Sequence, residues 1–251
     1  MSRLTLEKEK KIVKKCNKIL VTHEKYCQCY DHNNNPSIDI DKCSQKNKLK
    51  CDEYHLCKKY FRTKLNGYEP IYNPSRWENP LVLNSHNCYT YFLNDHNEYT
   101  INKCKEVCQK NKTCHSNPKK CSKFKPQPGK ISNQVINQFN CTNMIYNIMQ
   151  DNPSIKKTTF YDTCPNGYYK GAIVVHTNKT YHFYRQDKNV TWSHKPGILS
   201  VTNKDASANI IYAPHESDRN YQKGNKKGIN YNEFCSYLCV PTNKNKKTYS
   251  I

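Results

Sequence analysis

The sequence has no long apolar run. Its longest runs, such as Ala172 to Val175, are far short of the roughly 20 residues that a helix needs to cross a bilayer, so we expect no transmembrane segment. The opening residues, Met1 to Lys11, also lack the apolar stretch of a signal peptide, and we expect no standard secretion signal. Apolar residues make up only 35 % of the chain, yet 20 Tyr and 7 Phe supply large surfaces to bury, which argues against general disorder.

Acidic residues and arginine are both scarce. The chain has 41 Lys and Arg against 20 Asp and Glu, a formal charge of +21, which would attract nucleic acid or an acidic protein. Only five of the basic residues are Arg, the residue suited to bidentate phosphate recognition, and no stretch interleaves Arg with aromatics. A nucleic-acid or acidic-protein partner is therefore an alternative, and a solvated basic surface is the simpler interpretation.

The 15 cysteines are too many to be incidental, but the pair of Cys-x-x-Cys motifs typical of zinc knuckles is missing. Cys27 and Cys29 with His23 or His32 form only a weak zinc pattern, so we expect disulfides and neither a metal nor a cofactor. The odd number leaves one thiol unpaired. A virus that assembles in the cytosol with its own thiol oxidase would reconcile disulfides with the missing secretion signal, so we expect a viral particle or the host cytoplasm.

Changes in composition and a proline-rich segment divide the chain into regions. We expect a cysteine-rich helical cap over residues 1–75, followed after a proline-rich linker by an α+β region over 76–241. The second region contains a cysteine-rich insertion at about 100–125, and a mobile basic tail follows over 242–251. Apolar spacing indicates an amphipathic helix in the opening segment and a short helix around residues 51–61.

Periodicity predicts the elements of the second region. A helix begins at Cys88 after N-cap candidates at residues 84–87, and another covers residues 131–150. Three strands then form an antiparallel meander, and a short helix with Cys235 and Cys239 on one face closes the region. The predicted strands cover residues 168–176, 181–186 and 190–194, and the closing helix covers residues 231–239.

Cys88, His182 and His194 form the combination that could carry chemistry. A thiol nucleophile needs a helix N-terminus and an imidazole to lower its pKa, and a third polar group to orient that imidazole. Cys88 stands where a helix begins, and His194 follows His182 by twelve residues across a short turn, which lets both histidines share one face.

At these residues the chain resembles the NlpC/P60 and CHAP branch of the papain-like superfamily. The resemblance covers residues 80–200 and rests on Asn87 to Tyr91, the Pro128-Gly129 turn and the two histidines. It implies a helix on a small antiparallel sheet and hydrolysis of a peptide or amide through a thioester. Cys88 would be the nucleophile and oxyanion donor through its backbone N–H, His182 the general base, and His194 the orienting group, with Asp187 as the alternative.

A second resemblance leads to a different hypothesis. Residues 181–187 and 192–197 are similar to uncharacterised proteins of mimivirus-type giant DNA viruses. This similarity fits a non-catalytic particle protein, stabilised by disulfides, whose lysines bind a genome or an acidic partner. In that case Cys88 would be bridged or inert.

Overall fold

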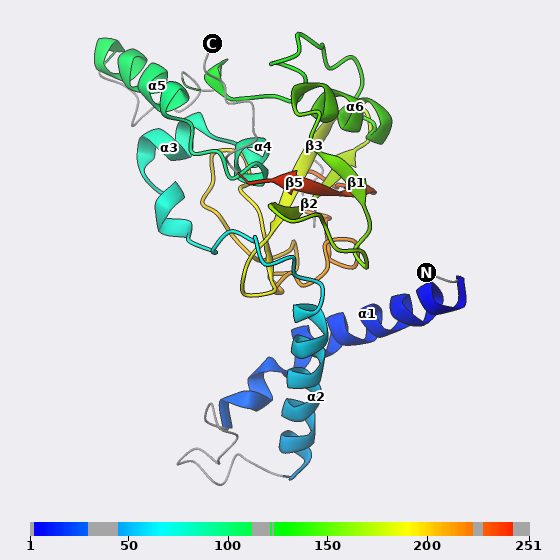
Figure 1. Cartoon of the computed structure of the whole chain (residues 1–251). Coiled ribbons are helices and arrows are strands. Elements are labelled where there is room, and N and C mark those ends of the chain that lie inside the picture. Colours follow the sequence, from blue (N-terminus) through cyan, green and yellow to red (C-terminus); the bar gives the residue numbers. More distant parts are fainter. Residues whose placement is uncertain (1–2, 30–44, 112–120, 122, 223–227, 243–251) are drawn as a thin grey trace.

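The computed structural model describes residues 3–29, 45–111, 121, 123–222 and 228–242 (Figure 1). Within them, helices accompany one five-stranded antiparallel sheet, which confirms the predicted α+β class at this level. None of the helices in these ranges is long and apolar enough to cross a membrane. The predicted basic tail, apart from Thr242, lies outside the described residues.

The sheet has the strand order β1-β5-β2-β3-β4, and each neighbouring pair is antiparallel. The predicted meander is present as β2, β3 and β4, with Val174 opposite His182 in its first pair. The third strand is shorter than expected, because it pairs with β3 only at Arg185 and Gln186. The strands are β1 Lys156–Thr158, β2 Tyr168–His176, β3 Thr180–Gln186, β4 Trp192–Ser193 and β5 Glu233–Pro241.

Different parts of the chain cover the two faces of this sheet. On one face, Ile173 and Val175 of β2 pack with side chains of α4 and α6. On the other face, Ala172 and Val174 belong to a cluster with Ile211 and Tyr212, which also includes residues of α1 and α2. A strand buried on both faces needs apolar residues at every position, which explains the continuous run of β2. The helices are α1 Arg3–His23, η1 Glu24–Cys29, α2 Gln45–Arg62, η3 Pro74–Trp77, α3 Pro80–Ser85, α4 Cys88–Phe92, α5 Glu98–Asn111 and α6 Cys141–Asp151.

Disulfides connect elements that are distant in the sequence. Two of them join α2 to α1 and η1, and a third ties α5 to Cys121. The described bridges are Cys16–Cys57, Cys27–Cys51, Cys104–Cys121, Cys141–Cys235 and Cys164–Cys239. The prediction of a disulfide-rich protein is confirmed, and Cys88 is the free cysteine in the described part of the chain.

The predicted closing helix is wrong: residues 233–241 form strand β5, between β1 and β2. A spacing of four residues puts Cys235 and Cys239 on one face of a helix, but in the strand they bridge to different segments, Cys235 to Cys141 of α6 and Cys239 to Cys164. The period of two is hidden because a bulge interrupts it. The register passes from Ile173 opposite Ser236 to Val174 opposite Phe234, which leaves Cys235 as the extra residue.

The predicted helix over residues 131–150 begins only at Cys141. Asn140 caps it by accepting a hydrogen bond from the Asn143 amide at 2.9 Å. Asp151, at the end of this helix, accepts from the amides of Gly129 at 2.7 Å and Ser132 at 2.9 Å. These bonds fold the segment before α6 into a turn, and a helix there would lose them.

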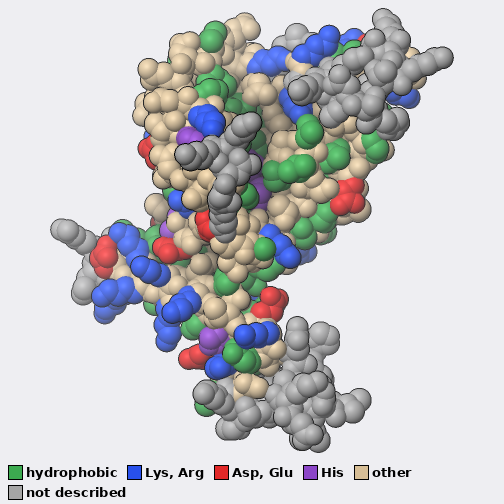
Figure 2. All heavy atoms as spheres, turned by 180° about the vertical axis from the view of Figure 1, so that it is seen from behind, with side chains coloured by type: hydrophobic (Ala, Val, Ile, Leu, Met, Phe, Trp, Pro, Cys, Tyr) green, Lys and Arg blue, Asp and Glu red, His purple; other side chains and the backbone are tan. Residues whose placement is uncertain are grey.

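Basic side chains gather along α1, as Figure 2 shows on the face opposite to that of Figure 1. Two lysines depart from the predicted solvated surface, because Lys170 and Lys195 are fully buried. The ammonium group of Lys170 donates to the carbonyls of Lys64 at 3.1 Å and Phe160 at 3.0 Å. Part of the lysine content therefore holds loops together in the core.

A buried ion pair joins the C-terminal part of β3 to α4. The guanidinium of Arg185 donates to Asp187 Oδ1 at 3.0 Å and to the Tyr91 hydroxyl at 2.8 Å, and both members of the pair are at most 1 % exposed. Tyr91 in turn lies 2.6 Å from the Ser193 hydroxyl. Arg185 thus connects the end of β3 directly to α4, and Tyr91 extends the connection to β4.

Arg185→Met is therefore expected to lower the free energy of unfolding by about 3–5 kcal/mol, because it leaves the Asp187 carboxylate buried without its cation. Urea unfolding, followed through the fluorescence of buried Trp77 and Trp192, measures the change. The double variant Arg185→Met/Asp187→Leu removes both charges and should recover part of the loss. A change below about 1 kcal/mol in the single variant would show that the pair does not stabilise the fold.

Candidate active site

The first turn of α4 fixes the position of Cys88. The side chain of Asn87 accepts from the amides of Tyr89 and Thr90, both at 3.1 Å, and the Thr90 hydroxyl accepts from the Asn87 amide at 2.9 Å. The other end of α4 lies directly on β2, where a Cβ at Gly171 would clash with the ring of Phe92. Glycine is required there because the helix approaches the strand so closely.

The thiol of Cys88 is enclosed by backbone and basic groups. Burial raises the pKa of Cys88 to about 12, against the opposing effects of the Phe183 amide, the Lys195 ammonium and the amides of Cys88 and Tyr89. The side chain is nearly inaccessible, since the residue is 7 % exposed. At neutral pH the resting group is consequently a thiol, and it needs a base to become a nucleophile.

The sulfur lies at the open edge of β3. Tyr181 and Phe183 of this strand pack against α4, whereas His182 alternates to the other side. Because β4 pairs with β3 only farther along, the Phe183 amide is left to donate to the Cys88 sulfur, next in the chain to His182. Tyr231 links the two faces: its ring stacks on His182 at 5.1 Å, and its pKa is raised by burial and by the Cys88 charge.

The structure brings His182 and His194 together, but Cys88 lies on the opposite side of β3 and no hydrogen bond among the described residues joins it to His182. His182 Nε2 lies 2.8 Å from His194 Nδ1, and His194 Nε2 lies 3.0 Å from the carbonyl oxygen of Lys204. Burial lowers the pKa of His194 to about 4, and burial and His194 lower that of His182 well below its ordinary value. Both rings are therefore neutral at pH 7.

Two neutral rings joined by these hydrogen bonds can carry their protons in one arrangement only. The Lys204 carbonyl accepts, so His194 carries its proton on Nε2 and presents a bare Nδ1. His182 must then donate from Nε2 to that atom, which leaves Nδ1 of His182 without a proton. Nδ1 of His182 can therefore accept a proton, as a general base must.

The alternative orienting residue, Asp187, lies elsewhere in the network. It accepts from the Nε and Nη2 atoms of Arg185 at 3.2 and 3.0 Å, whereas the described side-chain hydrogen bond of His182 is the one that it donates to His194. The Cys88 amide, predicted as an oxyanion donor, takes no part in the Asn87 cap, which uses the next two amides.

Sequence reasoning missed Lys195. Its ammonium donates to the carbonyls of Leu83 at 2.9 Å, His86 at 3.1 Å and Gly197 at 2.6 Å. It therefore ties the segment that leads into Cys88 to the residue next to His194. Burial and the charge of Lys125 lower the pKa of Lys195 to about 7. The sequence does not indicate this role, because a lysine in a Lys-rich chain is expected to lie on the surface.

A basic hollow of about 500 Å³ opens beside α4. Lys125 lines it and interacts electrostatically with Cys88, and Gln127 in the same wall accepts from the Tyr181 hydroxyl. Asn87 holds this wall against the helix by donating to the Pro126 carbonyl at 2.6 Å. Lys123, Lys130 and Gln134 complete the polar lining.

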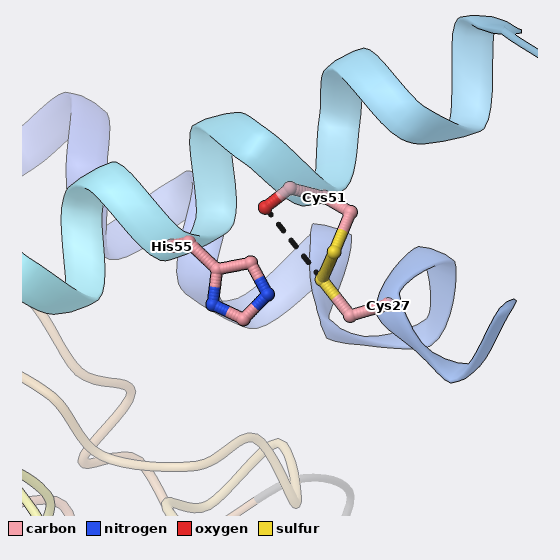
Figure 3. A group of neighbouring side chains, drawn as sticks. All are labelled: Cys27, Cys51 and His55. Atoms are coloured by element: carbon pink, nitrogen blue, oxygen red, sulfur yellow. Dashed lines mark hydrogen bonds between the residues drawn. A yellow bond between two sulfur atoms is a disulfide. The ribbon is translucent and has the colours of Figure 1, made fainter. Parts of the chain in front are cut away.

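Two cysteine groups in the described residues have the spacing of metal ligands. One consists of Cys27, Cys51 and His55, but Figure 3 shows that a disulfide joins the two sulfurs. The zinc pattern considered from the sequence thereby loses Cys27 as a thiolate ligand. The other consists of Cys104, Cys108 and Cys121, in which Cys104 and Cys121 are also bridged. Oxidised sulfurs do not offer the thiolates that zinc needs.

Comparison with known proteins gives little further information. No protein-family model matches the chain, and no solved structure matches it. A stretch of 48 residues is 46 % identical to insoluble matrix shell protein 1 of Ruditapes philippinarum. The match covers 19 % of this chain and 32 % of that protein, so the chain matches about a third of its relative.

Proposed function

We propose that the protein is a cysteine hydrolase of the papain-like type, similar to the NlpC/P60 and CHAP branch, which cleaves a peptide or amide bond. The observation that carries this proposal is the chain from His182 through His194 to the Lys204 carbonyl, which leaves a bare Nδ1 on His182. Residues 76–241 would form the hydrolase domain and residues 1–75 its cap.

This mechanism requires Cys88 and His182, which lie on opposite sides of β3, to meet around the open edge of that strand. The Cys88 thiol then gives its proton to His182 Nδ1 as the sulfur attacks the substrate carbonyl carbon. The C–N bond breaks, the leaving amine takes the proton from His182, and a thioester remains on Cys88. Water then attacks the thioester while His182 removes its proton, and the thiol is regenerated with release of a carboxylic acid. His194 stabilises the imidazolium by accepting from Nε2.

The surroundings of the thiol favour a substrate with acidic groups. The hollow beside α4 has Lys123, Lys125 and Lys130 in its lining, and Lys125 lies within electrostatic reach of Cys88. A peptide with carboxylates flanking the scissile amide would therefore bind better than a neutral one.

Alkylation of the non-reduced protein tests this function. We expect iodoacetamide to label Cys88 selectively, because Cys88 is the free cysteine among the described residues. Peptide mapping by mass spectrometry identifies the labelled residue. If His182 accepts the thiol proton, the rate of Cys88 alkylation at pH 7 is lower in His182→Ala than in the parent protein. An inert buried thiol would behave differently: its rate would rise about tenfold per pH unit between pH 5 and 8 and would be the same in both proteins.

The second candidate is a non-catalytic, disulfide-stabilised structural protein of a particle or matrix, with a basic surface for nucleic acid or an acidic partner. The partial similarity to a shell matrix protein and the five described bridges favour it. In that case Cys88 is a buried thiol, so its alkylation is independent of His182. The same labelling experiment therefore decides between the two candidates.

A further inference from the structure

A second hollow, of about 490 Å³, lies between α1 and the ends of β1 and β5. Its floor residues Phe160 and Tyr237 belong to the core cluster on the α1 side of the sheet, whereas Cys88 belongs to the cluster on the other side. The hollow is therefore separate from the candidate active site. Its lining includes Lys11 and Lys14 of α1, and Phe160, His215, Phe234 and Tyr237.

Aromatic rings form the inner wall of this hollow. Phe160 lies 5.6 Å from Tyr237, and Phe234 lies 4.8 Å from the same ring, measured between ring centroids. His215 adds a fourth ring, 5.4 Å from Phe160. The bulge at Cys235 creates this surface, because it puts Phe234 and Tyr237 on one face. Such a wall suits a flat apolar group.

Lysines of α1 form the opposite side. Lys10, Lys11 and Lys14 all line the hollow, while Glu216 is the one acidic residue in its lining. Glu7 offsets Lys10 through an ion pair of 2.7 Å, which leaves Lys11 and Lys14 as the charges that a ligand would meet. An aromatic wall alone could hold a cation, but this positive side repels one.

We propose that this hollow binds an organic anion with an aromatic body and one anionic group. The body would lie against Phe160, Phe234 and Tyr237, and the anionic group would lie between Lys11 and Lys14. The volume is in the range of about 300–1,000 Å³ that is typical of small-molecule sites. The inference does not depend on the hydrolase proposal, because no residue of the Cys88 site lines the hollow.

The probe 8-anilinonaphthalene-1-sulfonate has this chemistry, and its fluorescence reports binding. We expect saturable binding by the full chain and an at least tenfold weaker Kd in the double variant Lys11→Glu/Lys14→Glu. The matched control, Lys15→Glu/Lys18→Glu, changes the same charge on the same helix outside the hollow and should alter the Kd less than twofold. The neutral analogue N-phenyl-1-naphthylamine should bind both variants equally.

Equal weakening in the two double variants would overturn the proposal, since the probe would then respond to net charge alone. Loss of the neutral probe together with the anionic one in Lys11→Glu/Lys14→Glu would also contradict it, because the aromatic wall would then be disturbed. Cys88→Ala should leave the Kd unchanged, which keeps the outcome independent of the hydrolase test.

Discussion

His182→Ala is expected to lower kcat/KM for an acidic peptide amide by about 10²–10⁴-fold, the range that general acid–base catalysis supplies. His182 presents the bare Nδ1 and holds its other proton toward His194, so no other described group combines both properties. His194→Ala should reduce kcat with little change in KM, because it removes the acceptor that orients the ring without touching the substrate. Initial rates with a fluorogenic peptide series, compared between variants, provide the measurement.

A histidine outside the site serves as the control. His176 is at the end of neighbouring strand β2 and accepts from the Asn230 amide at 3.3 Å, so His176→Gln should leave the rate unchanged. Cys88→Ala should abolish turnover. Turnover that survives in Cys88→Ala, or that is equal in His182→Ala and the parent chain, would contradict the proposed mechanism.

Acid should destabilise the fold steeply. Burial lowers the pKa of His86 to about 3, and those of His194 and His215 to about 4, and His182 is shifted in the same direction. Below about pH 6.5 these rings bind protons in the unfolded chain but stay neutral in the folded state. The free energy of unfolding therefore decreases as the pH falls. Asp187 acts in the opposite sense, because burial raises its pKa to about 6 and the folded state then binds its proton first.

The four histidines and the one carboxyl act in opposite senses, so the unfolded state binds about three more protons than the folded state. The free energy of unfolding should therefore fall by about 4 kcal/mol per pH unit between about pH 6 and 4.5. Urea unfolding at four pH values across this window measures the slope. His215→Gln removes one of these protons and should make the slope shallower by about a quarter to a third. A flat profile between pH 6 and 4.5 would show that the rings are protonated in the folded protein.

Local signals in the sequence determined several parts of this protein. The Asn87 cap marked the start of α4, the alternation and turns marked the β2–β3–β4 meander, and the odd number of cysteines agreed with a free Cys88. The spacing of His182 and His194 across a short turn predicted two histidines on one face, and the structure brings them to 2.8 Å. Apart from the cysteine count, each of these features depends on residues that are near one another in the chain.

Tertiary structure decided the rest, because the deciding contacts join residues far apart in the sequence. Residues 233–241 became the strand between β1 and β2 only through pairing on both sides, and the bulge at Cys235 concealed their period. Lys195 became a core residue through carbonyls more than 100 positions away. The proton arrangement of the two histidines follows from the Lys204 carbonyl, which no pattern of residue types could have supplied.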